Sequence, residues 1–127
     1  SYALFKYEAM IADPAFRRAA VEDCLRTWGE MTLAGATSFW ETIRGAADFD
    51  NAGSLCHGWS AVPAWLWFEG ALGVHPLEPG FRRFSFDPLP EIQAHAVVPT
   101  PFGDMHISGN TISYNRELQK LQQDPRD

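Results

Sequence analysis

The segment from Ser60 to Leu72 places the strongest constraint on the fold, because it has a helical pattern and is apolar on nearly every side. Its apolar residues are Ala61, Val62, Ala64, Trp65, Leu66, Trp67, Phe68, Ala71 and Leu72. A helix without a polar face must be buried around most of its circumference, and Gly73 predicts its end. The other predicted helices are too few to cover it, so we expect a larger helical body to pack around it.

Two further helices are predicted before this segment. Residues Tyr2–Ile11 have the pattern of the end of one helix. Asp13 and Pro14 predict the start of a longer one, as the N-cap and the first helical residue. An apolar residue recurs every four positions along it, which predicts a buried stripe on a helix that ends before Gly35. The stripe consists of Phe16, Ala20, Cys24 and Trp28, with Val21, Leu25 and Met31 beside it. The solvated face is predicted to hold Arg17, Arg18, Glu22, Asp23 and Arg26.

The pattern changes from helical to β near Pro76, so we predict an α+β fold. Before that point, Ser38–Arg44 is expected to be a short helix or turn, and Ala46–Ser54 a polar loop. After it, short alternating runs predict strands in FRRFSFD, IQAHAVV, DMHISG and TISYN, with a hairpin at SGNTIS. The polar stretch Arg116–Asp127 is expected to be frayed or loosely helical.

Composition excludes several classes of protein. The 127 residues suffice for one ordinary domain, and 46% apolar with 20% charged residues is typical of a globular chain. The net charge of −6 argues against a nucleic-acid partner, which needs a basic surface. The longest apolar run, Ala61–Phe68, is too short to span a membrane.

No cofactor or metal is expected from the sequence. The four histidines have no ligand spacing, and neither a P-loop nor a GxSxG motif is present. Cys24 and Cys56 do not form a CxxC pair and are predicted to be small buried apolar side chains. The sequence opens at Ser1 directly into a helical pattern, so we expect it to come from a longer protein. Its localisation is therefore left open.

Glu41 and His57 are the candidate site residues, and each has two interpretations. Glu41 follows Trp40 and is predicted to open a short helix. There its carboxylate would either interact favourably with the helix dipole or act as a catalytic group beside an aromatic ring. His57 precedes the apolar helix and either caps or packs there, or binds a ligand. Trp59 lies two residues on. Indole faces together with the Asp48–Asn51 loop are the mixture that a sugar site needs.

Several linked motifs resemble one family of enzymes. WGEMTLAGATSFWETI, SLCHGWSAVPAWLWFEGALGVHPLEPGFRRFSFDPLP and VPTPFGDMHIS are similar to the C-terminal region of the α-L-rhamnosidases, a glycoside hydrolase family. The elements GAT-x-x-W-E, H-x-W, PGF and PTPFG occur in the same order. The resemblance extends from Tyr2 to Ser108.

The resemblance implies a fold and an activity. It implies the last helices of an (α/α)₆ barrel over 1–75, the start of an antiparallel β-sandwich over 76–115, and a polar tail over 116–127. In this family two carboxylates hydrolyse terminal α-L-rhamnose with inversion. Glu41 matches the general base and His57 a residue that contacts the rhamnose, with Trp40 and Trp59 beside them.

The general acid of the family lies in an earlier barrel segment. The resemblance therefore implies two partners, a rhamnose-containing carbohydrate and the rest of the barrel, and no activity for the chain alone. We expect Glu41 and His57 to face one concavity. Two other hypotheses for the function stay open: another (α/α)₆ glycoside hydrolase, and a non-catalytic structural module.

Overall fold

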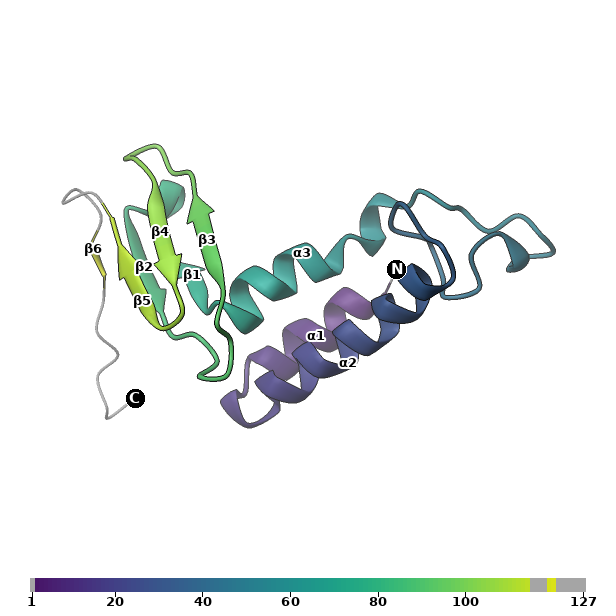
Figure 1. The fold of residues 1–127 in the computed structure, drawn as a ribbon, viewed down its shortest axis with the longest axis horizontal. Helices are drawn as coiled ribbons and strands as arrows, with labels where there is room; N and C mark the ends of the chain where they lie inside the picture. The colour runs from purple at the N-terminus through teal and green to yellow at the C-terminus, as the bar shows by residue number, and fades with distance from the viewer. Residues whose placement is uncertain (1, 115–118, 121–127) are drawn as a thin grey trace. The chain divides into compact units, whose positions relative to one another are not determined.

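Helices come first in the chain and small sheets follow, so the protein has the predicted α+β fold (Figure 1). The structure is a computed structural model that describes residues 2–114 and 119–120. These residues divide into two units after Trp67, and each unit is described by itself. The helical unit contains α1 (Ala3–Ile11), α2 (Pro14–Leu33), α3 (Val62–Leu66) and the 3₁₀ turns η1 (Gly45–Ala47) and η2 (Gly58–Ser60).

Helix α2 begins and ends as the sequence predicts. The Asp13 carboxylate accepts a hydrogen bond of 2.9 Å from the backbone N–H of Ala15, and Pro14 is the first helical residue. At the other end the chain turns at Gly35, which has a φ of 91°. The backbone N–H of Ala36 donates back to the Met31 carbonyl, so the turn satisfies one of the last helical carbonyls.

The predicted stripe of α2 is wrong in its first turn. Ala20 and Cys24 are buried as expected, but Phe16 is 55% exposed and Arg17, predicted to be solvated, is only 8% exposed. The reason is geometric, because each step of four residues rotates about 40° around a helix of 3.6 residues per turn. Three such steps carry Phe16 off the face that Trp28 occupies. Leu25, also expected beside the stripe, is 58% exposed.

A charged cluster joins α1 to α2 around Asp23. Its carboxylate accepts hydrogen bonds from Lys6 Nζ at 2.5 Å, from Arg26 Nη2 at 2.6 Å and from the Tyr7 hydroxyl at 2.8 Å. The hydrogen bonds from Lys6, then Arg26 and Tyr7, hold the pKa of Asp23 well below its usual value. Burial, and then the hydrogen bond to Asp23, raise the pKa of Tyr7. The Tyr7 phenol is therefore a neutral donor inside the unit.

The all-apolar segment is helical, but its hydrogen bonding changes along its length. The α-helix Val62–Leu66 is followed by a π-helical turn, η3 (Trp67–Ala71), and the chain then turns at Gly73, which has a φ of 64°. Val62 and Leu66 are buried, whereas Ala64 is exposed. Over Val62–Leu66 burial is thus found on one side only, whereas Ala71 and Leu72 at the end of the segment are buried as expected.

The second unit contains two small sheets. Strand β1 (Val74–Pro76) pairs antiparallel with β2 (Arg83–Phe86), which pairs parallel with β6 (Gln119–Lys120). Strands β3 (His95–Val98), β4 (Met105–Ser108) and β5 (Thr111–Ser113) form an antiparallel sheet. The 3₁₀ turn η4 (Pro79–Phe81) precedes β2.

The predicted hairpin is confirmed, because Ser108 pairs with Thr111 across a two-residue turn. The strands predicted in all four runs are present, whereas β1 was not expected from the sequence. Of the predicted polar tail, Gln119 and Lys120 form β6, and the rest lies outside the described residues.

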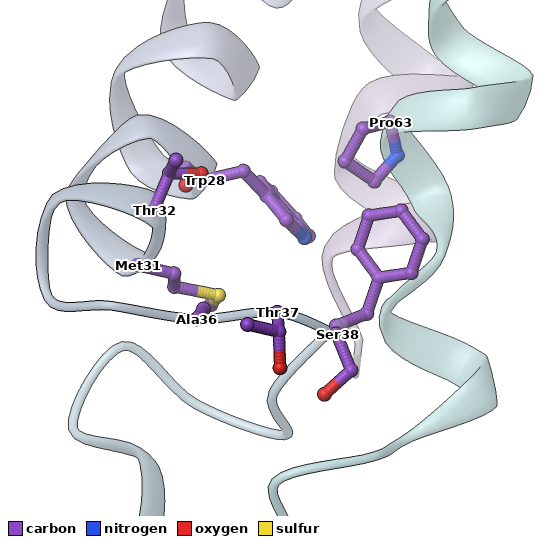
Figure 2. A pocket seen from close by; sticks show the side chains of 8 residues that line it. Trp28, Met31, Thr32, Ala36, Thr37, Ser38 and Pro63 are labelled. Carbon is purple, nitrogen blue, oxygen red and sulfur yellow. Dashed lines mark hydrogen bonds between the residues drawn. The ribbon is translucent and has the colours of Figure 1, made fainter.

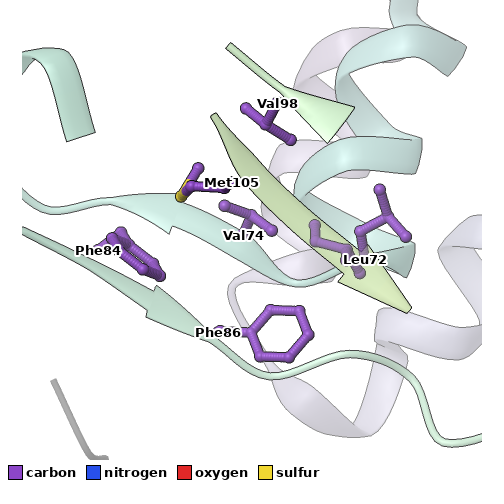
Figure 3. Close-up of a cluster of buried hydrophobic side chains, with 7 residues drawn as sticks. Leu72, Val74, Phe84, Phe86, Val98 and Met105 are labelled. Carbon is purple, nitrogen blue, oxygen red and sulfur yellow. The ribbon is translucent and has the colours of Figure 1, made fainter. Parts of the chain in front are cut away.

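Apolar side chains of both sheets meet in one cluster within this unit, which Figure 3 shows. Its buried members are Leu72, Val74, Phe84, Phe86, Val98, Met105 and Ile107. The alternation in β2 and β4 produces this cluster, because every second side chain of a strand faces the same side. The alternating pattern of these two strands therefore determines which of their side chains join the core.

Asp23→Asn should lower the free energy of unfolding of the helical unit by about 1–3 kcal/mol at neutral pH, because the amide loses the charge that binds Lys6 and Arg26. The folded-state pKa is depressed, so the stabilisation is present above about pH 4 and is lost as the pH falls below it. Urea unfolding followed by tryptophan fluorescence measures it, since all five tryptophans lie between residues 28 and 67.

Glu22→Gln on the exposed face of α2 is the matched control and should change little. The difference between wild type and Asp23→Asn should shrink at about pH 2. A difference that is equally large in acid would show that the charge of Asp23 does not stabilise the unit.

Candidate functional site

Two segments of the connection between α2 and α3 run antiparallel to each other. The backbone N–H of Glu41 donates to the Ser54 carbonyl at 2.9 Å, and the N–H of His57 donates to the Phe39 carbonyl at 2.8 Å. The Ser38 hydroxyl also donates to the Leu55 carbonyl. We call Phe39–Glu41 and Ser54–His57 the paired segments. They bring the W-E and H-x-W motifs into one loop.

Glu41 does not open a helix, so that prediction was wrong. It lies in the irregular stretch before η1, which begins only at Gly45. Its half-buried carboxylate accepts a hydrogen bond of 3.3 Å at Oε2 from the Ser54 N–H. Within the described part of the chain, Oε1 has no hydrogen-bond partner. Contact with a helix dipole therefore does not explain this residue.

His57 stands immediately before η2 but does not cap it, because its side chain makes no hydrogen bond to the turn. Its Nε2 atom is buried, and the described residues supply no hydrogen-bond partner for it. A buried polar atom without a partner costs about 1–3 kcal/mol. This nitrogen is therefore an unsatisfied polar atom inside the loop.

The two tryptophans of the motifs have different environments. Trp59 is 80% exposed, and its ring meets the imidazole of His57 edge-on at 6.2 Å between centroids. Trp40 is partly buried and packs over Gly45, where an added Cβ would lie 2.6 Å from Trp40 Cε3. Trp59 can thus present a flat apolar face to a ligand, whereas Trp40 shapes the loop.

The polar stretch from Gly45 to Gly53, which we call the tip of the loop, is tightly wound. The Asp48 carbonyl accepts hydrogen bonds of 3.0 Å from the N–H groups of both Ala52 and Gly53. Phe49, Asp50 and Asn51 have φ values of 51°, 58° and 68°. Three consecutive side-chain-bearing residues in this left-handed region are unfavourable and persist only where the surrounding structure imposes them.

A cavity of about 270 Å³ lies beside the first paired segment (Figure 2). Trp28 and Pro63 face each other across it, with Thr37 and Ser38 along one edge. Its lining residues are Trp28, Met31, Thr32, Ala36, Thr37, Ser38, Phe39 and Pro63. Neither Glu41 nor His57 lines it, so the concavity expected for these two side chains is not this one.

Trp28 ties this cavity wall to the end of the loop. Its indole N–H donates to the Ser60 carbonyl at 2.9 Å, and its ring lies 6.1 Å from that of Tyr7. The sequence placed Trp28 only in the apolar stripe of its helix, and did not single out Ser54, Gly45 and Gly53, which hold the paired segments. The glycine-containing stretch DNAGS was the only signal for the last of these.

Neither metal nor disulfide chemistry is indicated by the described residues. No group of three or more His, Cys, Asp and Glu side chains among them is arranged to hold a metal ion. Both cysteines are free, and Cys56 is exposed rather than buried as predicted, because it lies on the loop instead of a helix face. No helix in residues 2–114 combines the length and apolar character that crossing a membrane requires.

Comparison of the chain with protein-family models gives no match, and comparison with curated proteins gives no relative. The roles of Glu41, His57, Trp40 and Trp59 therefore stay predictions.

The two cysteines should differ sharply in alkylation by iodoacetamide. Burial, together with the Asp23 carboxylate, raises the pKa of the Cys24 thiol to about 11. The thiolate is the reactive form, so Cys24 should react only after denaturation, while the exposed Cys56 should react in the folded protein. Mass spectrometry of digested protein measures both sites, with Cys56→Ser as the control. Equal rates at the two sites in the folded chain would contradict the burial of Cys24.

Proposed function

We propose that this chain carries the general-base side of the active site of an inverting α-L-rhamnosidase. Residues 1–75 would be the last helices of an (α/α)₆ barrel, 76–115 the start of an antiparallel β-sandwich, and 116–127 a polar tail. The enzyme would hydrolyse terminal α-L-rhamnose from glycans or glycosides. The observation that carries this proposal is the pairing of Phe39–Glu41 with Ser54–His57, which joins the two motifs of the resemblance.

In this proposal Glu41 activates the attacking water. A general base needs a lone pair that the protein does not already use, and Oε1 of Glu41 offers one while Oε2 is held by the Ser54 N–H. The proton of the water moves to Glu41 as the oxocarbenium-like state forms. The acid that protonates the leaving group stands on the other side of the sugar, about 6.5–9.5 Å away. The proposal assigns it to a barrel segment outside this sequence.

His57 and Trp59 would hold the sugar. A sugar hydroxyl that reached the unsatisfied Nε2 of His57 would supply its missing hydrogen bond, and the exposed indole of Trp59 offers an apolar face for the C–H side of the ring. A neutral sugar needs no cofactor or metal to be recognised in this way.

One observation favours a second candidate, a non-catalytic loop in which Glu41 is structural. The hydrogen bond from Ser54 N–H to Glu41 Oε2 fastens the paired segments to each other, and a fastening role alone would explain a glutamate here. The two candidates differ in whether the charge of Glu41 matters, because a neutral amide oxygen still accepts that hydrogen bond.

Glu41→Gln should therefore lower kcat on an aryl α-L-rhamnoside by about 10²–10⁴-fold while the loop keeps its fold, because an amide cannot accept the proton of water. The assay uses the protein made from the complete reading frame that contains this sequence. His57→Ala should raise KM as well, since a substrate hydroxyl loses its partner. The 127-residue chain alone should be inactive.

Glu22→Gln provides the matched control, since it makes the same change on the exposed face of α2. Near-normal kcat in Glu41→Gln would leave Glu41 with the structural role. Failure of the complete protein to hydrolyse any aryl glycoside would overturn the proposal, and turnover only of other sugars would favour another (α/α)₆ glycoside hydrolase.

A further inference from the structure

The two ends of the loop tip cross at a pair of glycines. Gly53 lies so close to Gly45 that an added Cβ would be 2.0 Å from the Gly45 carbonyl oxygen and 3.0 Å from its carbonyl carbon. These are backbone atoms, which cannot turn away as the end of a flexible side chain can. Only glycine therefore allows this approach at position 53.

Gly45 is required on the other side of the crossing for two separate reasons. Its φ of 55° lies in the left-handed region. An added Cβ would also lie 2.6 Å from Trp40 Cε3 and 3.1 Å from Leu55 Cδ2, one atom on each paired segment. The tryptophan of the W-E motif can thus pack against the crossing only because this residue has no side chain.

The crossing is directly continuous with the candidate base. Gly53 precedes Ser54, whose N–H binds the Glu41 carboxylate and whose carbonyl binds the Glu41 N–H. On the other side of the crossing, the Gly45 N–H donates to the carbonyl of Thr42, one residue beyond Glu41, at 3.1 Å. A displacement of the backbone at Gly53 must therefore move the group that orients Glu41.

We propose that Gly45 and Gly53 are positioning residues that set the placement of Glu41 relative to His57 for catalysis. The part of this role that concerns catalysis rests on the proposed function. Close approach at the crossing fixes the register of the paired segments, and the left-handed turn at Phe49–Asn51 is the conformation that the tip must adopt to close it. Neither glycine contacts the sugar.

Other glycines of the helical unit supply matched controls. Gly29, in the middle of α2, has open space around an added Cβ. Gly35 has a φ of 91° and the same open space, so substitution there tests backbone strain without a close contact. Gly53→Ala tests the contact with backbone atoms. Gly45→Asn tests the contact with the side chains of Trp40 and Leu55, which can shift more readily than backbone, because asparagine tolerates the left-handed region.

The first measurement is amide hydrogen exchange in the 127-residue chain. The amides of Glu41 and His57 report the two backbone hydrogen bonds of the paired segments. Gly53→Ala should speed their exchange by about tenfold or more, because local opening then needs less free energy. Amides within α2 should be unchanged, which shows that the unit is folded. Gly29→Ala and Gly35→Ala should leave the Glu41 and His57 amides unchanged, and Gly45→Asn should give a smaller increase than Gly53→Ala.

The second measurement is a double-mutant cycle on kcat in the protein from the complete reading frame. Gly53→Ala alone should lower kcat by about 10²-fold, since a base displaced by about 1 Å loses that much. In the Glu41→Gln background the same change should have little further effect, because the base through which Gly53 acts is already gone. A purely structural glycine would give additive losses.

Each result decides one part of the proposal. Unchanged exchange in Gly53→Ala overturns the positioning role even if the protein is an active rhamnosidase. Faster exchange with additive losses of kcat also overturns it, since Gly53 would then act on stability alone. An inactive wild-type protein overturns the proposed function and the catalytic part of this inference with it.

Discussion

Two backbone hydrogen bonds, Glu41 N–H to Ser54 O and His57 N–H to Phe39 O, determine where the groups of the candidate site lie. The stretch that contains them has no strand, so these two bonds pair its backbone segments, as a ladder of hydrogen bonds does in a sheet. Because the main chain forms them, these bonds fix the relative positions of the Glu41 and His57 backbones, and the Ser54 N–H then holds one oxygen of the Glu41 carboxylate. The loop therefore has a defined backbone at both candidate residues.

The helices hold the ends of that loop. Helix α2 is fixed at its start by the Asp13 cap and along its length by Asp23, which gathers donors from both α1 and α2. At its far end the Trp28 indole reaches across to the Ser60 carbonyl, just before α3. The buried Tyr7 supports Trp28 from α1. The loop thus starts and ends on elements that are tied to each other.

Local chemistry made parts of the fold predictable. The Asp13-Pro14 start of α2, its end at Gly35 and the Ser108–Thr111 hairpin each depend on residues a few positions apart. The environment of Glu41 could not be predicted, because its partner Ser54 is 13 positions away and the pairing follows from a glycine crossing that no periodicity marks. The exposure of Phe16 was missed because a strict four-residue repeat drifts around the helix.

The closure from Trp28 to Ser60 has a consequence for how this protein can change in length. With the ends of the loop already held together, lengthening the tip beyond Gly45 adds only a slowly growing entropic cost. Insertions there would leave the crossing and the two motifs in place if both glycines were retained. The tip is thus the segment of this loop that could be lengthened with the least effect on the crossing and on the two motifs.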